Sequence, residues 1–259
     1  MAAIDSNADF VSETCSLSVP RIYLPVPLQS GAEVMLDARA AQHVVRALRL
    51  KAGASLILFN GEGGEYAATL QPVSGATAKA AVGNFIARDA ESPLTVILAQ
   101  AISRGERMDY AIQKAVELGV SHIQPLVTEF CVVKIQQERV DKRLAHWQGI
   151  IISACEQSGR TRVPTISAPA SYTRWLADCA SAVKLVLDPY ATQGLSYLPQ
   201  PAGDITLLIG PEGGLSDAEL AQAHHAGFIS VRLGARMLRT ETAPMAALAA
   251  VQTLWGDLR

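Results

Sequence analysis

Residues 205–255 read ITLLIGPEGGLSDAELAQAHHAGFISVRLGARMLRTETAPMAALAAVQTLW, and this stretch decides the fold. The apolar runs at 205–209 and 229–233 predict buried strands, because a strand covered on both faces is apolar throughout. Each run leads through a turn into a helical pattern, over 216–226 and 242–258. Strands that alternate with helices predict a parallel sheet with flanking helices, which is an α/β fold.

The same alternation extends upstream to residue 94. Further strands are expected at 94–101, 122–127 and 183–187, and further helices at 105–118, 138–157 and 171–180. We therefore predict an α/β domain over residues 91–259, which follows the Glu91-Ser92-Pro93 boundary.

The residues before this boundary have a different pattern. A glycine-rich turn separates two strand patterns, at 54–59 and 65–70, and this predicts a β-hairpin. A helix is expected over 38–50. We predict a small β-barrel-like domain over 20–90 and a flexible extension over 1–19.

The composition limits the classes of function. The 22 basic and 24 acidic residues give a net charge of -2, so any contact with nucleic acid must use local positive charge. The four cysteines are scattered and lack metal-ligand spacing, which suits a reducing cytoplasm and predicts no metal site. No apolar run approaches the roughly 18 residues of a membrane span, and the first residues lack a signal-peptide pattern. We expect a cytoplasmic protein without a membrane partner.

Two loops after the C-terminal strands carry the candidate chemistry. The first, GPEGG at 210–214, has three glycines and a proline, so its shape is constrained and its backbone can approach a ligand. Ser216 and Glu219 follow with the spacing of a capping box. The loop lacks the lysine of a phosphate loop and the G-x-G-x-x-G of a dinucleotide site. The residues alone leave a ligand loop and a structural turn as alternatives.

The second loop, residues 233–241, contains Arg236, Arg239 and Glu241. It lies where a parallel sheet presents the carboxyl ends of its strands, which is the usual ligand edge. Thr242 is the expected N-cap of the last helix. A solvated loop with an Arg–Glu ion pair is the alternative that the residues leave open.

These motifs together resemble a known family. The segments IGPEGG and LGARMLRTETA are similar to the SPOUT superfamily, specifically its 16S ribosomal RNA uridine N3-methyltransferase family. The segments QAISRGERMDYAIQKAVELGVSHIQPL, SACEQSGRTRVP, HVVRALRLKAG and FNGEGGEY also resemble that family, so the similarity covers residues 20–257. Arg104 stands where relatives often carry lysine, and residues 1–19 have no counterpart.

The resemblance implies a trefoil-knotted SPOUT-type domain at the C-terminus, a PUA-like RNA-binding domain at the N-terminus, and a homodimer. General topology rules disfavour knots, so the resemblance alone supports that feature. The homodimer has independent support, because the 242–258 pattern is apolar on nearly every face and should be buried on more than one side. A helix inside a monomer is the alternative.

The resemblance also implies methyl transfer from S-adenosylmethionine, without a metal, to N3 of a uridine in 16S ribosomal RNA of the small subunit. The implied donor-binding residues are Leu187, Gly210, Pro211, Glu212, Gly213, Gly214, Leu233, Gly234, Met237 and Leu238. Arg239 would stabilise charge that develops on the uracil oxygens, and Glu241 would act as general base or orient Arg239.

RNA contact requires local positive charge. Arg46, Arg49 and Lys51 near the N-terminus, and Arg160 and Arg162 after the long helix, are the candidates. Three other functions are open: a non-enzymatic RNA-binding assembly factor, a SPOUT methyltransferase for another RNA or a ribose 2′-hydroxyl, and a nucleotide-dependent α/β enzyme.

Overall fold

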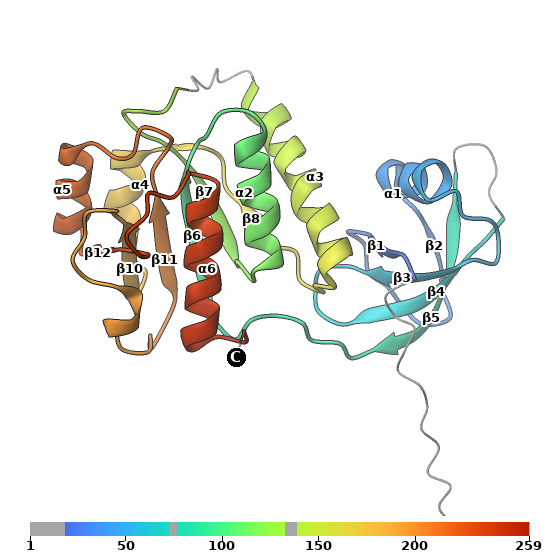
Figure 1. The fold of residues 1–259 in the computed structure, drawn as a ribbon. Helices are drawn as coiled ribbons and strands as arrows, with labels where there is room; N and C mark the ends of the chain where they lie inside the picture. The colour runs from blue at the N-terminus through green and yellow to red at the C-terminus, as the bar shows by residue number, and fades with distance from the viewer. Residues whose placement is uncertain (1–18, 73–76, 133–138, 259) are drawn as a thin grey trace, which may run out of the picture. The chain divides into compact units, whose positions relative to one another are not determined.

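The computed structural model describes residues 19–72, 77–132 and 139–258. The chain divides into two compact units, Met1–Arg88 and Asp89–Arg259 (Figure 1). Each unit has its own sheet and its own core.

The N-terminal unit is built on a five-stranded sheet. Its strands are β1 (Arg21–Tyr23), β2 (Glu33–Met35), β3 (Ser55–Phe59), β4 (Glu65–Leu70) and β5 (Lys79–Ile86), in the order β1-β3-β4-β5-β2. β1 is parallel to β3, and the other pairs are antiparallel. β3 and β4 form the hairpin that the glycine-rich turn predicted.

The helix expected over 38–50 is shorter and less regular than the sequence suggested. α1 (Ala38–Gln42) begins after Asp37, whose carboxylate accepts a hydrogen bond from the backbone N–H of Ala40 at 2.7 Å. A short π-helix, His43–Ala47, continues it. Its buried side packs into the core of the sheet.

The C-terminal unit is built on a seven-stranded parallel sheet. Its strands are β6 (Val96–Ala101), β7 (His122–Val127), β8 (Thr165–Ile166), β9 (Ala170–Ser171), β10 (Val183–Leu187), β11 (Ile205–Ile209) and β12 (Ile229–Val231). The order is β12-β10-β11-β6-β7-β8, and β9 pairs with β7. The bounds of β7, β10 and β11 are those expected from the sequence, and the two short strands β8 and β9 were not predicted.

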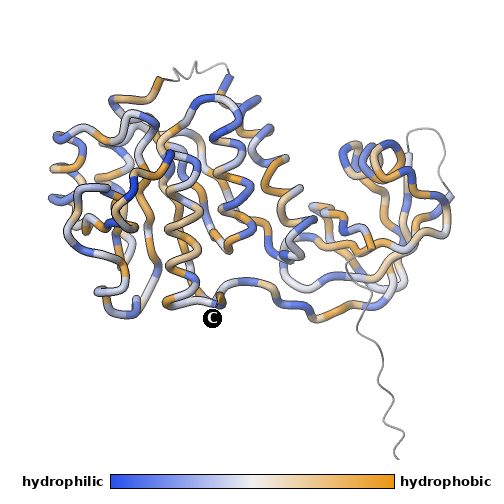
Figure 2. Tube along the Cα trace, in the orientation of Figure 1, coloured by the Kyte–Doolittle hydropathy of each residue, from blue (hydrophilic) through white to orange (hydrophobic). Residues whose placement is uncertain are grey.

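Helices cover both faces of this sheet (Figure 1). α2 (Glu106–Glu117), α3 (Val140–Ser158) and α6 (Thr242–Trp255) lie on one face, where α2 contacts both α3 and α6. α4 (Tyr172–Asp178) and α5 (Asp217–His225) share an apolar cluster with the other face. Hydrophobic residues predominate along α6 and the central strands (Figure 2). The predicted α/β architecture is confirmed for this unit.

The two predicted helix caps had different outcomes. The hydroxyl of Ser216 accepts from the backbone N–H of Glu219 at 3.3 Å, and the Glu219 carboxylate accepts from the Ser216 N–H at 3.0 Å, so the capping box is confirmed. The prediction of Thr242 as N-cap is wrong, because α6 begins at Thr242 and its cap is Glu241. The N–H of Thr242 already donates to the carbonyl of Arg239 at 2.9 Å, so the chain turns one residue earlier than expected.

Candidate active site

The predicted donor-binding residues lie at the end of one strand and in two loops, at one edge of the sheet. Leu187 ends β10, the loop Gly210 to Gly214 follows β11, and the loop Leu233 to Leu238 follows β12. These strands are parallel neighbours in the order β12-β10-β11, so their carboxyl ends meet (Figure 1). The fold therefore brings the three segments together at the usual ligand edge.

The loop from Gly210 to Gly214, here called the glycine loop, closes tightly on itself and on a neighbour. A Cβ on Gly210 would lie 3.1 Å from the backbone carbon of Gly214. A Cβ on Gly213 would lie 2.9 Å from the Cβ of Phe130. Gly214 has a φ of +75°, and its N–H donates to the carbonyl of the buried Pro211 at 2.9 Å. The loop therefore presents bare backbone.

Apolar side chains line the same edge without being fully buried. Met237 is 70% exposed, and Leu187, Leu233 and Leu238 are partly exposed. Large apolar side chains beside bare backbone are typical of a ligand site rather than of a core.

A buried hydroxyl joins the glycine loop to the segment before α6. Thr240 is 6% exposed, and its Oγ1 donates to the carbonyl of Gly210 at 2.9 Å. The same atom lies 3.0 Å from Oγ of Ser103 and accepts from Nε2 of Gln100 at 3.3 Å. One side chain thus links the ends of β6 and β11 to the last loop. The sequence offered one signal for this network, the polar Gln100 inside an apolar strand.

The two candidate catalytic residues are close in sequence but do not pair with each other. Arg239 is exposed, and no ion pair among the described residues includes it. Glu241 lies 4.0 Å, Oε2 to Nε, from Arg107 of α2. That oxygen is buried and has no hydrogen-bond partner within the described ranges. The cation beside Glu241 is therefore Arg107, a residue that the sequence did not single out, and not Arg239.

Arg107 also reaches the glycine loop. Its Nη1 donates to Oε1 of Glu212 at 3.2 Å, and the backbone N–H of Arg104 donates to the same oxygen at 3.0 Å. Burial raises the pKa of Glu212, but these hydrogen bonds and the Arg107 charge outweigh it and lower the pKa below its ordinary value. The Glu212 side chain therefore anchors the loop to the start of α2.

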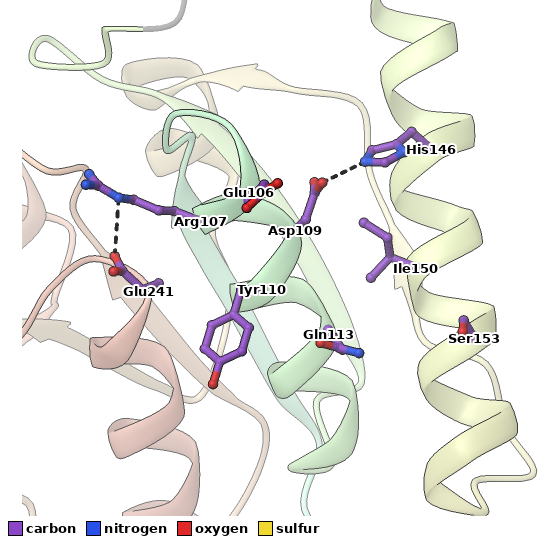
Figure 3. A pocket seen from close by; sticks show the side chains of 9 residues that line it. All are labelled: Glu106, Arg107, Asp109, Tyr110, Gln113, His146, Ile150, Ser153 and Glu241. Carbon is purple, nitrogen blue, oxygen red and sulfur yellow. Dashed lines mark hydrogen bonds and ion pairs between the residues drawn. The ribbon is translucent and has the colours of Figure 1, made fainter.

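A pocket of about 600 Å³ opens between α2, α3 and the start of α6 (Figure 3). Its lining residues are Glu106, Arg107, Asp109, Tyr110, Gln113, His146, Ile150, Ser153 and Glu241. Nε2 of His146 and Oδ2 of Asp109 form a hydrogen bond across it at 2.8 Å. Of the predicted site residues, Glu241 alone lines this pocket. The pocket is therefore separate from the sheet edge that carries the predicted donor-binding residues.

Comparison with known proteins assigns the chain to a family. Residues 90–252 match a family model described as an RNA methyltransferase domain, and residues 36–80 match an RNA methyltransferase PUA domain. Ribosomal RNA small subunit methyltransferase E of Buchnera aphidicola subsp. Schizaphis graminum is 36% identical over 93% of this chain and 98% of its own length. The chain belongs to the ribosomal RNA small subunit methyltransferase E family. The Mycobacterium bovis member is 32% identical over 90% of each chain.

Solved structures of methyltransferase E and its relatives share this fold. A Neisseria gonorrhoeae methyltransferase E bound to S-adenosylmethionine has a TM-score of 0.87 and 44% identity, covering 93% of this chain and 100% of that one. A putative methyltransferase of Legionella pneumophila, in complex with S-adenosylmethionine, has a TM-score of 0.90 and 41% identity, covering 93% and 99%. The predicted fold class, a SPOUT-type domain with a PUA-like β domain, is confirmed.

In this member of the methyltransferase E family, the residues predicted to contact RNA differ in exposure. Arg46, Arg49 and Lys51, here called the basic cluster, are exposed at the end of the π-helix and just after it. Arg162 is exposed as well, while its backbone N–H donates to Glu91 at 3.0 Å. These four side chains are available for phosphate contact.

Arg160 requires a correction, because its side chain is 7% exposed and already occupied. Its Nε and Nη2 donate to Oε2 of Glu91 at 2.9 and 2.6 Å. Its Nη1 donates to the carbonyls of Val116 and Val120 at 3.0 and 2.8 Å. A guanidinium held in this way stabilises the unit and cannot reach a phosphate. The sequence could not reveal this, because Glu91 is distant along the chain.

The described residues contain neither a cluster of metal ligands nor a membrane-spanning helix. No group of three or more His, Cys, Asp or Glu side chains in ranges 19–72, 77–132 and 139–258 is arranged to hold a metal ion. In the same ranges, no helix has both the length and the apolar character needed to cross a membrane.

Proposed function

We propose that this chain transfers the methyl group of S-adenosylmethionine to N3 of a uridine in 16S ribosomal RNA of the small subunit, in the cytoplasm. One observation carries the proposal. The carboxyl ends of three neighbouring parallel strands meet beside Arg239 and Glu241, in a chain 44% identical to a methyltransferase E that binds S-adenosylmethionine. The coarser activity, methylation of 16S ribosomal RNA from S-adenosylmethionine, is that of the family.

The described residues fit the methyl donor. The bare backbone of the glycine loop offers N–H and C=O groups for the polar rim of adenine. The partly exposed side chains of Leu187, Leu233, Met237 and Leu238 offer an apolar slot for its ring. Gly234, with a φ of +75°, turns the backbone at the entry to this slot. When bound, the donor supplies an electrophilic methyl carbon for in-line displacement.

The acceptor chemistry assigns different roles to Arg239 and Glu241. Uridine N3 carries a weakly acidic proton on the pairing edge of the base, so the base must be unpaired to react. As that proton leaves, negative charge develops on O2 and O4, and the exposed Arg239 guanidinium can donate to these oxygens. The Glu241 side chain is 17% exposed and lies beside Arg107, so its carboxylate can take up the proton once the base is bound next to it.

RNA contact falls to the basic cluster and Arg162, all exposed, in the domains proposed at 20–90 and 91–259. Such contacts release counterions, so binding to small subunits should weaken as salt rises. Arg160 has no part in this, because its guanidinium is buried against Glu91.

The exposed side of α6 supports a homodimer. α6 packs against β11 and α2, yet a second apolar stripe remains partly exposed. The stripe comprises Met245, Ala246, Ala249, Ala250 and Leu254. A second copy of the chain can cover it in a twofold interface. Sedimentation equilibrium should give twice the mass of 27.5 kDa, and a monomer at micromolar concentration would contradict the interface.

The direct test is nucleoside mass spectrometry. Purified protein is incubated with S-adenosylmethionine that carries a labelled methyl group and with small subunits from a strain without methyltransferase E. Labelled 3-methyluridine in 16S ribosomal RNA is the expected product. Label on a ribose 2′-hydroxyl or in another RNA would favour a different SPOUT activity. No label together with no donor binding by calorimetry would favour an assembly factor.

The role of Arg239 has its own test. At saturating donor and subunits, Arg239→Ala should lower kcat by about 10²–10³-fold, the usual effect of removing a donor to developing negative charge. Its affinity for S-adenosylmethionine should match that of the wild type. Arg236→Ala removes the same charge from an exposed position in the same loop and serves as control. If Arg239→Ala binds the donor more weakly but keeps the wild-type kcat, Arg239 is not a catalytic residue.

A further inference from the structure

Arg107, in the first turn of α2, contacts both loops on which the proposed reaction depends, and Figure 3 shows its approach to Glu241. Its Nη1 contacts Glu212 of the glycine loop at 3.2 Å, and its Nε lies 4.0 Å from Glu241 at the start of α6. We propose that Arg107 is a positioning residue that holds the donor loop and Glu241 in a fixed relation. This inference rests on the proposed function, since it requires a donor on one loop and a base on the other.

The turn before α2 explains how one residue reaches both loops. Gly105, the N-cap of α2, has φ 60° and ψ -139°, a backbone conformation that side-chain-bearing residues rarely adopt. This turn directs the N–H of Arg104 and the guanidinium of Arg107 at the same carboxylate oxygen of Glu212. The partial positive charge of the helix start also favours a carboxylate there. The glycine loop is thus tied to α2 by three effects.

The second contact of Arg107 concerns a carboxylate that lacks other support. Oε2 of Glu241 is buried, and no described residue donates a hydrogen bond to it. Arg107 is the cation that pairs with it among the described residues. Without Arg107, the Glu241 side chain would lose its orienting charge, while its backbone would stay in place as the cap of α6.

Arg107 contributes little to stability, and this makes a positioning role measurable. Its side chain is 49% exposed, and ion pairs of exposed side chains contribute little to stability. A displacement of about 1 Å in a reacting group can nevertheless lower a rate by about 10²-fold. Loss of Arg107 should therefore affect donor affinity and turnover much more than folding.

The test compares Arg107→Gln with Lys114→Gln, which removes the same charge from the same helix at an ion pair with Glu117. Arg107→Gln should weaken S-adenosylmethionine binding about 3–10-fold in calorimetry, equivalent to about 0.7–1.4 kcal/mol. It should also lower kcat at saturating donor by about 10-fold or more. Lys114→Gln should change neither quantity. Arg107→Lys keeps the charge but contacts one carboxylate at a time, so it should restore only part of each loss.

A double-mutant cycle separates positioning from a general effect on folding. Glu212→Gln should weaken donor binding, and the Arg107→Gln/Glu212→Gln pair should bind the donor no worse than Arg107→Gln alone. Hydrogen exchange of the peptide over the glycine loop should accelerate in both single variants, with no RNA present. Additive losses in donor affinity, or unchanged exchange, would overturn the inference.

The proposed function and this inference can fail separately. A wild type that gives a flat calorimetric trace with S-adenosylmethionine fails as a methyltransferase, and the inference falls with it. A wild type that binds and methylates, beside an Arg107→Gln variant equal to Lys114→Gln, overturns the positioning role alone. If Arg107→Gln does not fold, partial recovery of donor affinity and kcat in Arg107→Lys still supports the positioning role. Wild-type donor affinity and wild-type kcat in Arg107→Lys would overturn it, because a lysine contacts one carboxylate at a time.

Discussion

Replacing Thr240 with valine should loosen the carboxyl edge of the C-terminal sheet, because valine keeps the shape of threonine and lacks its hydroxyl. The carbonyl of Gly210, at 2.9 Å, loses its donor. Ser103 and Gln100 also lose a contact, but each keeps the carbonyl of Ala101 as a partner. A fully buried acceptor left without a donor costs about 1–3 kcal/mol, and Gly210 is partly buried, so we expect a loss of about 1 kcal/mol in the free energy of unfolding. Donor affinity should fall as well, since Gly210 is the first residue of the glycine loop, which is proposed to bind the donor.

Urea unfolding followed by tryptophan fluorescence measures this effect selectively, because all three tryptophans lie in the C-terminal unit. Thr253→Val is a matched control, since Thr253 is exposed and its hydroxyl donates only within α6, to the carbonyl of Ala249 at 2.8 Å. We expect the control to stay within about 0.5 kcal/mol of the wild type. Equal midpoints for Thr240→Val and Thr253→Val, with equal donor affinities, would refute the idea that the Thr240 hydroxyl holds the two loops together.

Three further predictions follow from the contacts described above. Arg160→Gln should destabilise the C-terminal unit by about 3–5 kcal/mol in the same urea assay, because it leaves the Glu91 carboxylate without its charged partner, and a near-neutral result would contradict this. Changing the basic cluster to glutamine should reduce the slope of log affinity for small subunits against log salt by about 2, and an unchanged slope would place the RNA elsewhere. Burial, together with the Glu219 charge, raises the pKa of Tyr172 to about 12, so this group stabilises the fold fully below pH 10 and loses that contribution as the pH rises through 12. Tyr172→Phe should lack this alkaline loss, and parallel pH–stability curves for the two proteins would rule out the effect.

Two of the strands that position the site were predictable because they are mostly apolar, and β11 is buried along its whole length. The runs that became β10 and β11 are almost wholly apolar, and turns mark their ends, so their bounds are the expected ones. The start of α5 was predictable for a local reason, since Ser216 and Glu219 satisfy each other's backbone within one turn. Patterns of this kind depend on neighbours in sequence alone.

The partners of the charged residues were not predictable, because they depend on contacts between distant segments. Arg160 looked like a phosphate ligand beside Arg162, yet Glu91 holds it in the interior. Glu241 looked like the partner of Arg239, yet Arg107 of α2 lies beside it. Sequence reasoning located the edge of the sheet where these charges gather, and only the folded chain shows which ones meet.

The contact between Phe130 and the glycine loop predicts which glycine substitutions can be suppressed by a second mutation. A methyl group at position 213 would collide with the Phe130 side chain, whereas the φ of +75° at Gly214 opposes any side chain there whatever surrounds it. A defect caused by Gly213→Ala should therefore be suppressible at a second site, with Phe130→Gly as the expected revertant. A defect caused by Gly214→Ala should yield no such suppressor, because the strain lies within the residue itself.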